Sequence, residues 1–161
     1  MSGARVARGS GETNVATGLP VLDHLVARLA QAGAFDLTLE IEPDDPGAEV
    51  DAAGRALGTA FGPLLPAGAH GEGAVPSAEA LAMVVLEVSG KPLVASNADL
   101  TGAGGLGTDL AARFLRGLAE AAGLTLHVRL IEGEDTDHVL EAIFKALGVA
   151  LRRATNAPAH D

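Results

Sequence analysis

The chain has 161 residues, with 11 Lys and Arg against 21 Asp and Glu, so its formal net charge at neutral pH is −10. Hydrophobic residues make up 48% of the chain, which excludes intrinsic disorder and predicts a single folded domain over residues 1–161. The absence of Cys excludes disulfides and thiolate chemistry. The acidity and the lack of Trp and Tyr argue against a nucleic-acid partner, and no apolar run reaches the roughly 18 residues that a membrane helix needs.

The first twenty residues lack the apolar stretch of a secretory leader, which predicts a cytoplasmic location. Residues 1–16, rich in Gly, Ser and charged side chains, predict a loose arm. A turn at 17–20 leads into a helix, because apolar residues recur at helical spacing from Val21 to Leu29 and Gly33 follows as a stop. Residues 35–42 alternate between apolar and polar types, which predicts a half-buried strand.

Three further helices are predicted in the rest of the chain. Residues 50–61 have a helical pattern, and the Gly- and Pro-rich segment 62–73 predicts a surface connection. Residues 81–88 and the apolar run after Pro92 predict a β-hairpin. After a Gly-rich loop, the chain predicts a helix capped by Thr108 and ended by Gly123, then a strand at 124–131 and a helix from Thr136 to about Arg153.

The two halves of the sequence resemble each other. Residues 29–41 read L-A-Q-A-G-A-F-D-L-T-L-E-I and residues 118–128 read L-A-E-A-A-G-L-T-L-H-V, and each half then reaches a helix containing Ala-Leu-Gly, at 56–58 and at 146–148. This predicts an α+β fold, two-layer and internally duplicated, with repeats over about 12–65 and 72–154. The first repeat is expected to be truncated at its N-terminal hairpin, because the sequence leaves no room for one there.

Polar side chains gather at the start of the last predicted helix. The i, i+3 spacing of His138 and Glu141 places both on one face, beside Asp137 and in line with Lys145. Imidazole and carboxylate at this spacing form metal sites in helical proteins. The same pattern also fits a solvated helix face with a carboxylate near the positive end of the helix dipole.

Four further polar residues are candidates for chemistry. They are His24 on the first predicted helix, Glu79 ahead of the hairpin, Lys91 in its turn and His127 on the strand at 124–131. By strict alternation, His127 faces away from the apolar residues of its strand. Each of the four also fits an ordinary surface role, and the residues alone leave both interpretations open.

Taken together, these segments are similar to the imidazoleglycerol-phosphate dehydratase family, a hydro-lyase of histidine biosynthesis. The resemblance covers most of residues 12–154. The stretches that show it are Thr-Gly-Leu-Pro-Val-Leu-Asp-His-Leu (17–25), Gly-Ala-Phe-Asp-Leu-Thr-Leu (33–39), Pro-Ser-Ala-Glu-Ala-Leu (76–81), Val-Ser-Gly-Lys-Pro (88–92), Gly-Leu-Thr-Leu-His-Val (123–128) and His-Val-Leu-Glu-Ala-Ile-Phe-Lys-Ala-Leu (138–147).

The resemblance implies a duplicated α+β fold assembled from trimers, with an active site between subunits that holds two Mn²⁺ ions. Divalent ions would stabilise an anionic intermediate while a carboxylate helps to remove a proton. A homo-oligomer, trimer or larger, is therefore expected, with a homologous dehydratase as a further candidate partner. The matching positions are metal ligands His24, His127, His138 and Glu141 with Asp137 in place of a histidine, catalytic carboxylates Glu79 and Glu141, and Lys91 and Lys145 for the substrate.

One part of the family pattern is missing. The first repeat should contain a His-His-x-x-Glu run, and counting back from the shared Ala-Leu-Gly places Gly47, Ala48 and Asp51 at those positions. Loss of ligands weakens metal binding. The sequence therefore predicts a family member with a degraded metal site and little or no dehydratase activity. The alternative is an active hydro-lyase that uses an altered metal site.

Overall fold

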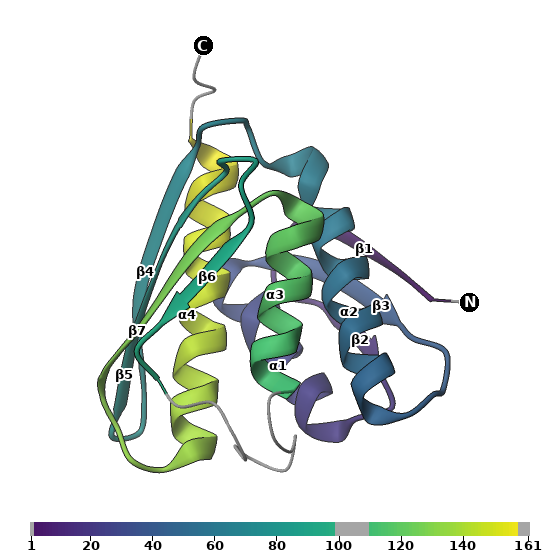
Figure 1. The fold of residues 1–161 in the computed structure, drawn as a ribbon, viewed down its shortest axis with the longest axis horizontal. Coiled ribbons are helices and arrows are strands. Elements are labelled where there is room, and N and C mark those ends of the chain that lie inside the picture. The colour runs from purple at the N-terminus through teal and green to yellow at the C-terminus, as the bar shows by residue number, and fades with distance from the viewer. Residues whose placement is uncertain (1, 99–109, 158–161) are drawn as a thin grey trace.

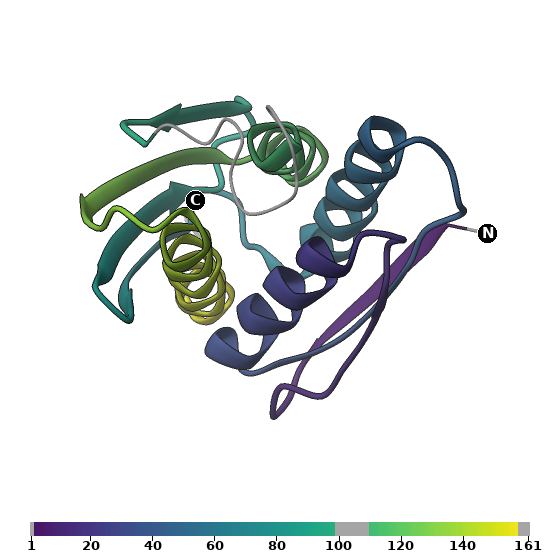
Figure 2. The same ribbon diagram turned by 90° about the horizontal axis from the view of Figure 1, so that it is seen from below.

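Four helices lie between two β-sheets in the computed structural model, which describes residues 2–98 and 110–157 (Figure 1; Figure 2). The first half of the chain forms one sheet and the two helices that cover its inner face. Its elements are β1 (Gly3–Arg8), β2 (Thr13–Ala16), α1 (Pro20–Gly33), β3 (Phe35–Glu40), α2 (Pro46–Phe61) and the short 3₁₀ helix η1 (Gly62–Leu64).

The second half forms the other sheet and its two helices. Figure 2 shows that the helices of both halves face each other at the centre of the molecule. The elements of this half are β4 (His70–Ser77), β5 (Ala80–Glu87), β6 (Leu93–Ser96), α3 (Leu110–Ala122), β7 (Thr125–Glu132) and α4 (Thr136–Asn156).

The two sheets share one plan of strand pairing, which confirms the predicted duplication. In the first sheet β3 lies between antiparallel β1 and parallel β2, and in the second β7 lies between antiparallel β5 and parallel β6. The second sheet adds β4, which pairs with β5, so its order is β4-β5-β7-β6 against β1-β3-β2. Within the described residues the first sheet has a counterpart of β5, which is β1, but none of β4, so the first repeat lacks this hairpin and is the shorter one, as predicted.

The N-terminal segment is not the loose arm that its composition predicts. β1 and β2 flank β3 on either side, and Ala4 and Val6 pack against the hydrophobic core. The loop between them is held by the carboxylate of Asp36, which accepts hydrogen bonds from the backbone N–H groups of residues 10–12. These bonds, chiefly the one from residue 10, hold the pKa of Asp36 below its ordinary value. Short strands of small residues give a weak local signal, and pairing with β3 decides their structure.

The predicted hairpin between residues 81–88 and the run after Pro92 is wrong in its pairing. β5 and β6 are both strands, but β7 lies between them. The hairpin is instead β4–β5, which turns through Ala78 at a left-handed φ of 51°. β4 also includes part of the segment predicted as a surface connection. The local sequence could not predict this pairing, because β7 comes later in the chain and lies between two earlier strands. The predicted cap Thr108 lies outside the described residues.

The two halves meet at two equivalent helix crossings, α1 with α4 and α2 with α3. In the first, a Cβ added to Gly148 would overlap the carbonyl oxygen of Leu29, and in the second a Cβ on Gly58 would lie 2.7 Å from the carbonyl oxygen of Leu118. Both glycines end the repeated Ala-Leu-Gly, and both leucines begin the repeated segment. The duplicated sequence therefore builds the same close backbone contact twice.

One hydrophobic core extends through both halves. The four Phe side chains are fully buried in it, Phe35 edge-on to Phe61 with ring centres 4.9 Å apart, and Phe114 stacked on Phe144 at 5.4 Å. Leu, Val, Ile and Ala make up the rest of the core. In the described part of the chain, no helix has the length and apolar character needed to cross a membrane.

Candidate metal and active site

The α1–α4 crossing brings His24 and Glu141 together. Leu22, Leu25 and the other apolar residues of α1 face the core, and His24 lies at the solvent edge of that stripe. Its Nε2 lies 3.4 Å from Oε2 of Glu141, a residue 117 positions later in the chain. Two predicted ligands therefore lie side by side at the crossing.

Glu141 is surrounded by positive charge. Its Oε1 lies 3.6 Å from Nε of Arg28 and 3.5 Å from Nζ of Lys145. Burial raises the pKa of Glu141, but the hydrogen bond with His24 and the charges of Lys145 and Arg28 outweigh burial and hold that pKa below its ordinary value. Arg28 was missed in the sequence, although its place one helical turn after His24 puts it on the same face.

Two further predicted site residues, Glu79 and His138, form a pair beside the first turn of α4. Glu79 lies in the β4–β5 turn, and its Oε1 contacts Nδ1 of His138. The N-cap Asp135 accepts hydrogen bonds from the backbone N–H groups of Asp137 and His138, which orients this turn. The hydrogen bond with Glu79 and the nearby carboxylates raise the pKa of His138 above its ordinary value.

The other predicted residues lie apart from these pairs or only line them. Asp137 shares with His24 and Glu141 the wall of a groove of about 360 Å³. His127 is exposed on the face of β7 that points away from the helices, between Val85 and Ala95. Lys91 lies in the loop before β6 and is likewise exposed. The predicted orientation of His127 is confirmed by the buried neighbours on either side of it.

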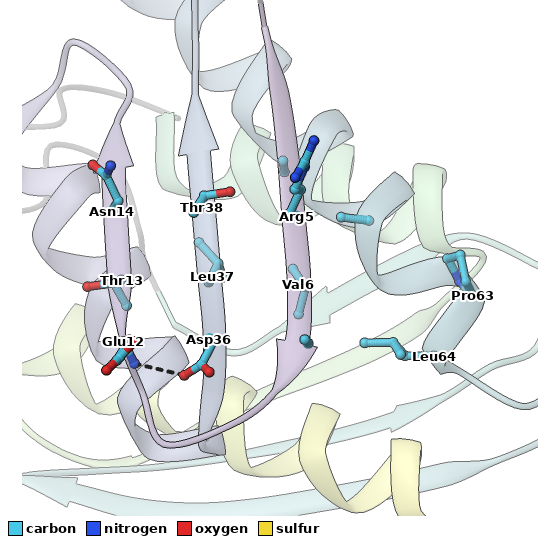
Figure 3. Close-up of a pocket in the computed structure, with 13 residues that line it drawn as sticks. Arg5, Val6, Glu12, Thr13, Asn14, Asp36, Leu37, Thr38, Pro63 and Leu64 are labelled. Atoms are coloured by element: carbon cyan, nitrogen blue, oxygen red, sulfur yellow. Dashed lines mark hydrogen bonds between the residues drawn. The ribbon is translucent and has the colours of Figure 1, made fainter.

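A larger groove, of about 760 Å³, lies on the first sheet and contains none of the predicted site residues. Figure 3 shows its walls, which include Arg5, Asn14 and Thr38 on the three strands. The carboxylate of Asp36 at its lower end already accepts backbone hydrogen bonds from the β1–β2 loop, one of which Figure 3 marks. The carboxylate of Asp36 therefore serves the fold.

The α2–α3 crossing contains an ion pair at the position that corresponds to His24 and Glu141. Aligning Leu29 with Leu118 places Arg113 opposite His24 (24 + 89 = 113), and aligning Gly58 with Gly148 places Asp51 opposite Glu141 (141 − 90 = 51). 

This pair is a close, two-point contact. Nε of Arg113 donates to Oδ1 of Asp51 at 3.1 Å, and its NH2 group donates both to Oδ2 of Asp51 and to the carbonyl oxygen of Gly47. The hydrogen bonds from Arg113 hold the pKa of Asp51 below its ordinary value. The repeat alignment was the signal that could have identified Arg113, had it been extended back from Leu118.

The comparisons with known proteins agree with this geometry. The sequence model described as "Imidazoleglycerol-phosphate dehydratase" matches residues 17–151, which include both helix crossings. The chain belongs to the imidazoleglycerol-phosphate dehydratase family. The resemblance stated from the sequence is thereby confirmed, and so is the duplicated α+β fold. Imidazoleglycerol-phosphate dehydratases act in histidine biosynthesis and are metal-dependent in general.

Curated relatives and solved structures give the extent of the similarity. The chain is 37% identical over 159 residues to the imidazoleglycerol-phosphate dehydratase of Acetivibrio thermocellus, covering 91% of this chain and 80% of the relative. It is 40% identical over 155 residues to that of Aromatoleum aromaticum, with the same shares covered. The crystal structure of IGPD from Pyrococcus furiosus in complex with (S)-C348 is similar to this chain, with a TM-score of 0.84 and 27% sequence identity. The match covers 94% of this chain and 86% of that one.

The donors of this chain fit the family metal in type but not in number. Imidazole nitrogen and carboxylate oxygen suit a divalent transition ion. Over residues 2–98 and 110–157, however, no three His, Asp or Glu side chains lie close enough to hold one ion. His24 with Glu141 and Glu79 with His138 are two separate pairs, and His127 faces another direction. The described part of one chain therefore does not by itself bring three such donors together.

Proposed function

We propose that this member of the dehydratase family has little or no activity on imidazoleglycerol phosphate. The observation that supports this is the Arg113–Asp51 ion pair at the α2–α3 crossing. The equivalent α1–α4 crossing has an imidazole and a carboxylate, both able to bind a metal ion. At α2–α3 a permanently charged guanidinium occupies the place of the imidazole and neutralises the carboxylate. The positive charge of Arg113 at that position would repel a metal ion.

A parallel assay tests this proposal. The chain is purified without chelator and its turnover of imidazoleglycerol phosphate is measured beside that of the Acetivibrio thermocellus relative, with Mn²⁺ added to both. We expect a rate at least about 100-fold below that of the relative, because loss of even supporting groups around a metal costs that much. Metal content is measured on the same samples. A comparable rate, with two ions bound per chain, would overturn the proposal.

A second candidate function is an active hydro-lyase with an altered site, and the two retained carboxylate–imidazole pairs favour it. In this case Mn²⁺ would be held by a selection of His24, His127, Asp137, His138 and Glu141, and completed by a neighbouring subunit. Glu79 and Glu141 would serve as the catalytic carboxylates, and Lys91 and Lys145 would contact the substrate. If activity is found, Glu79→Gln and Lys145→Gln should lower it, whereas Arg5→Gln, on β1 of the first sheet, should not.

We also propose that the two repeats fold as one domain that assembles into a homo-oligomer, trimer or larger, in the cytoplasm. The shared core of the two halves supports the single domain. The outer face of the second sheet supports assembly, because Leu93 on β6 and Ile131 on β7 are each about half exposed there, and His127 lies on the same face of β7, between β5 and β6. Sedimentation velocity that shows only monomer would contradict this assembly. Co-purification with a homologous dehydratase would show the second type of partner.

A further inference from the structure

The α2–α3 crossing also forms a groove of about 320 Å³ beside the Arg113–Asp51 pair. Three guanidinium groups meet in it, although the whole chain has only 11 basic residues and a net charge of −10. Asp51 and Arg55 come from α2 and Arg113 and Arg116 from α3, and both views show these helices side by side (Figure 1; Figure 2). The groove therefore concentrates positive charge on an otherwise acidic protein.

Two of these three guanidinium groups, those of Arg55 and Arg116, lie outside the ion pair. Arg113 is engaged with Asp51 and with the carbonyl oxygen of Gly47. Arg55 and Arg116 are exposed, and within the described part of the chain neither forms a hydrogen bond or ion pair. Glu120, one helical turn beyond Arg116, is the one other acidic residue of the groove wall. Two guanidinium groups from different helices are thus available to one ligand.

We propose that this groove binds a small phosphate-bearing anion through Arg55 and Arg116, at a site separate from the α1–α4 crossing. Guanidinium groups present pairs of N–H donors that match two phosphate oxygens, and two groups on separate helices can hold one dianion between them. Because the chain as a whole has a net charge of −10, the local positive potential of this groove attracts anions to it and not to the rest of the surface. The groove volume admits a phosphate ester with a short organic group.

The duplicated architecture explains how such a site can arise. At the α1–α4 crossing, Glu141 lies beside the cations Arg28 and Lys145 and beside the imidazole of His24. At α2–α3, Gly117 occupies the position that corresponds to Arg28 (28 + 89 = 117), which removes one side chain and leaves space at the crossing. Arg55 occupies the position that corresponds to Lys145 (145 − 90 = 55) and keeps its positive charge. The groove at the α1–α4 crossing is lined by the carboxylates of Asp137 and Glu141, whereas the groove at α2–α3 is lined by three guanidinium groups.

Amide chemical shifts during a phosphate titration test the proposal. Inorganic phosphate is added to the ¹⁵N-labelled full chain at constant ionic strength, with chloride as the reference salt. We expect saturable shifts at Gly117 and its neighbours on α3. The Arg55→Gln/Arg116→Gln double variant, which keeps the Arg113–Asp51 pair and so the fold, should bind phosphate at least about tenfold more weakly. Glu120→Gln should bind it about two- to fivefold more tightly, because a like charge is removed.

Two control variants separate this site from others. Arg129→Gln removes one positive charge from the outer face of β7, and Lys145→Gln removes the cation beside Glu141. Both should leave the Gly117 titration unchanged, even if Lys145→Gln weakens binding of imidazoleglycerol phosphate. The proposal is overturned if the double variant titrates like the wild type, or if Lys145→Gln abolishes the Gly117 shifts. A double variant that instead changes only the oligomer size would assign these arginines to a subunit contact and would also overturn it.

Discussion

The two helix crossings have the same backbone and different electrostatics. Gly148 against Leu29 and Gly58 against Leu118 both bring the helix backbones into close contact, which shows that duplication preserved the packing. The polar residues one and a half to two turns away differ. His24 meets Glu141 at one crossing, and Arg113 meets Asp51 at the other. The close contact constrains the backbone, whereas the solvent edge tolerates exchange of an imidazole–carboxylate pair for a guanidinium–carboxylate pair.

The largest expected effect concerns the close glycine contacts that both helix crossings share. Gly148→Ala should lower the free energy of unfolding by about 3 kcal/mol, because its Cβ would overlap a backbone carbonyl that cannot move alone. Gly58→Ala should cost somewhat less, since its closest approach is 2.7 Å. Gly62→Ala is the control, because nothing lies within 4 Å of its Cβ. Urea unfolding measures all three, and equal stabilities would show that the crossings are not tightly packed.

The next effect sharpens the difference between the ion pairs. A double-mutant cycle with Asp51→Asn and Arg113→Gln should give a coupling of about 1 kcal/mol, the upper end for partly exposed pairs, because Arg113 makes two hydrogen bonds to the carboxylate. The matching cycle with Glu141→Gln and His24→Gln should give about 0.3 kcal/mol, because the single contact there is 3.4 Å long. Both cycles use denaturant unfolding without added metal. A larger coupling at His24–Glu141 would contradict the comparison.

The pH dependence of the Asp51 pair gives a smaller effect with a defined sign. Arg113 holds the pKa of Asp51 below its ordinary value of 3.8, so the contribution to stability is fully present above 3.8 and is lost as pH falls through the lowered pKa. The stability difference between wild type and Asp51→Asn should therefore shrink on acidification from about pH 5 to about pH 2. Unfolding free energies at several pH values measure this. A difference that stays constant over that range would show that the ion pair does not form.

The smallest effect concerns protonation in the second repeat and has the opposite sign. Glu79 raises the pKa of His138, so that interaction stabilises the fold below the ordinary value of 6.5 and is lost as pH rises through the raised pKa. Glu79→Gln should return the pKa of His138 toward 6.5, as followed by NMR of the imidazole protons in metal-free protein. Arg129→Gln serves as the control. If the pKa of His138 is unchanged in Glu79→Gln, the contact between Glu79 and His138 does not form in solution.

Much of the fold was predictable because its signals are local. The stripe of α1, the alternation of β3 and β7, and the stop at Gly123 each depend on residues within about ten positions, and all appear as predicted. β1, β2 and β4 were missed because their small, Gly and Pro residues give a weak local signal, and pairing with other strands decides their structure. Four of the predicted site residues lie in two pairs, His24 with Glu141 and Glu79 with His138. Their roles came from the family resemblance and not from spacing, and they stay predictions.

By itself, the sequence determined the duplicated α+β plan, the faces of the helices and the family, because periodicity and repetition are written in neighbouring residues. Only the tertiary structure decided which strands pair and which charges meet. The Arg113–Asp51 contact joins residues 62 positions apart, and β7 enters its sheet between two strands that precede it in the chain. Such contacts depend on how the helices cross, and the crossing is set by the packed core as a whole.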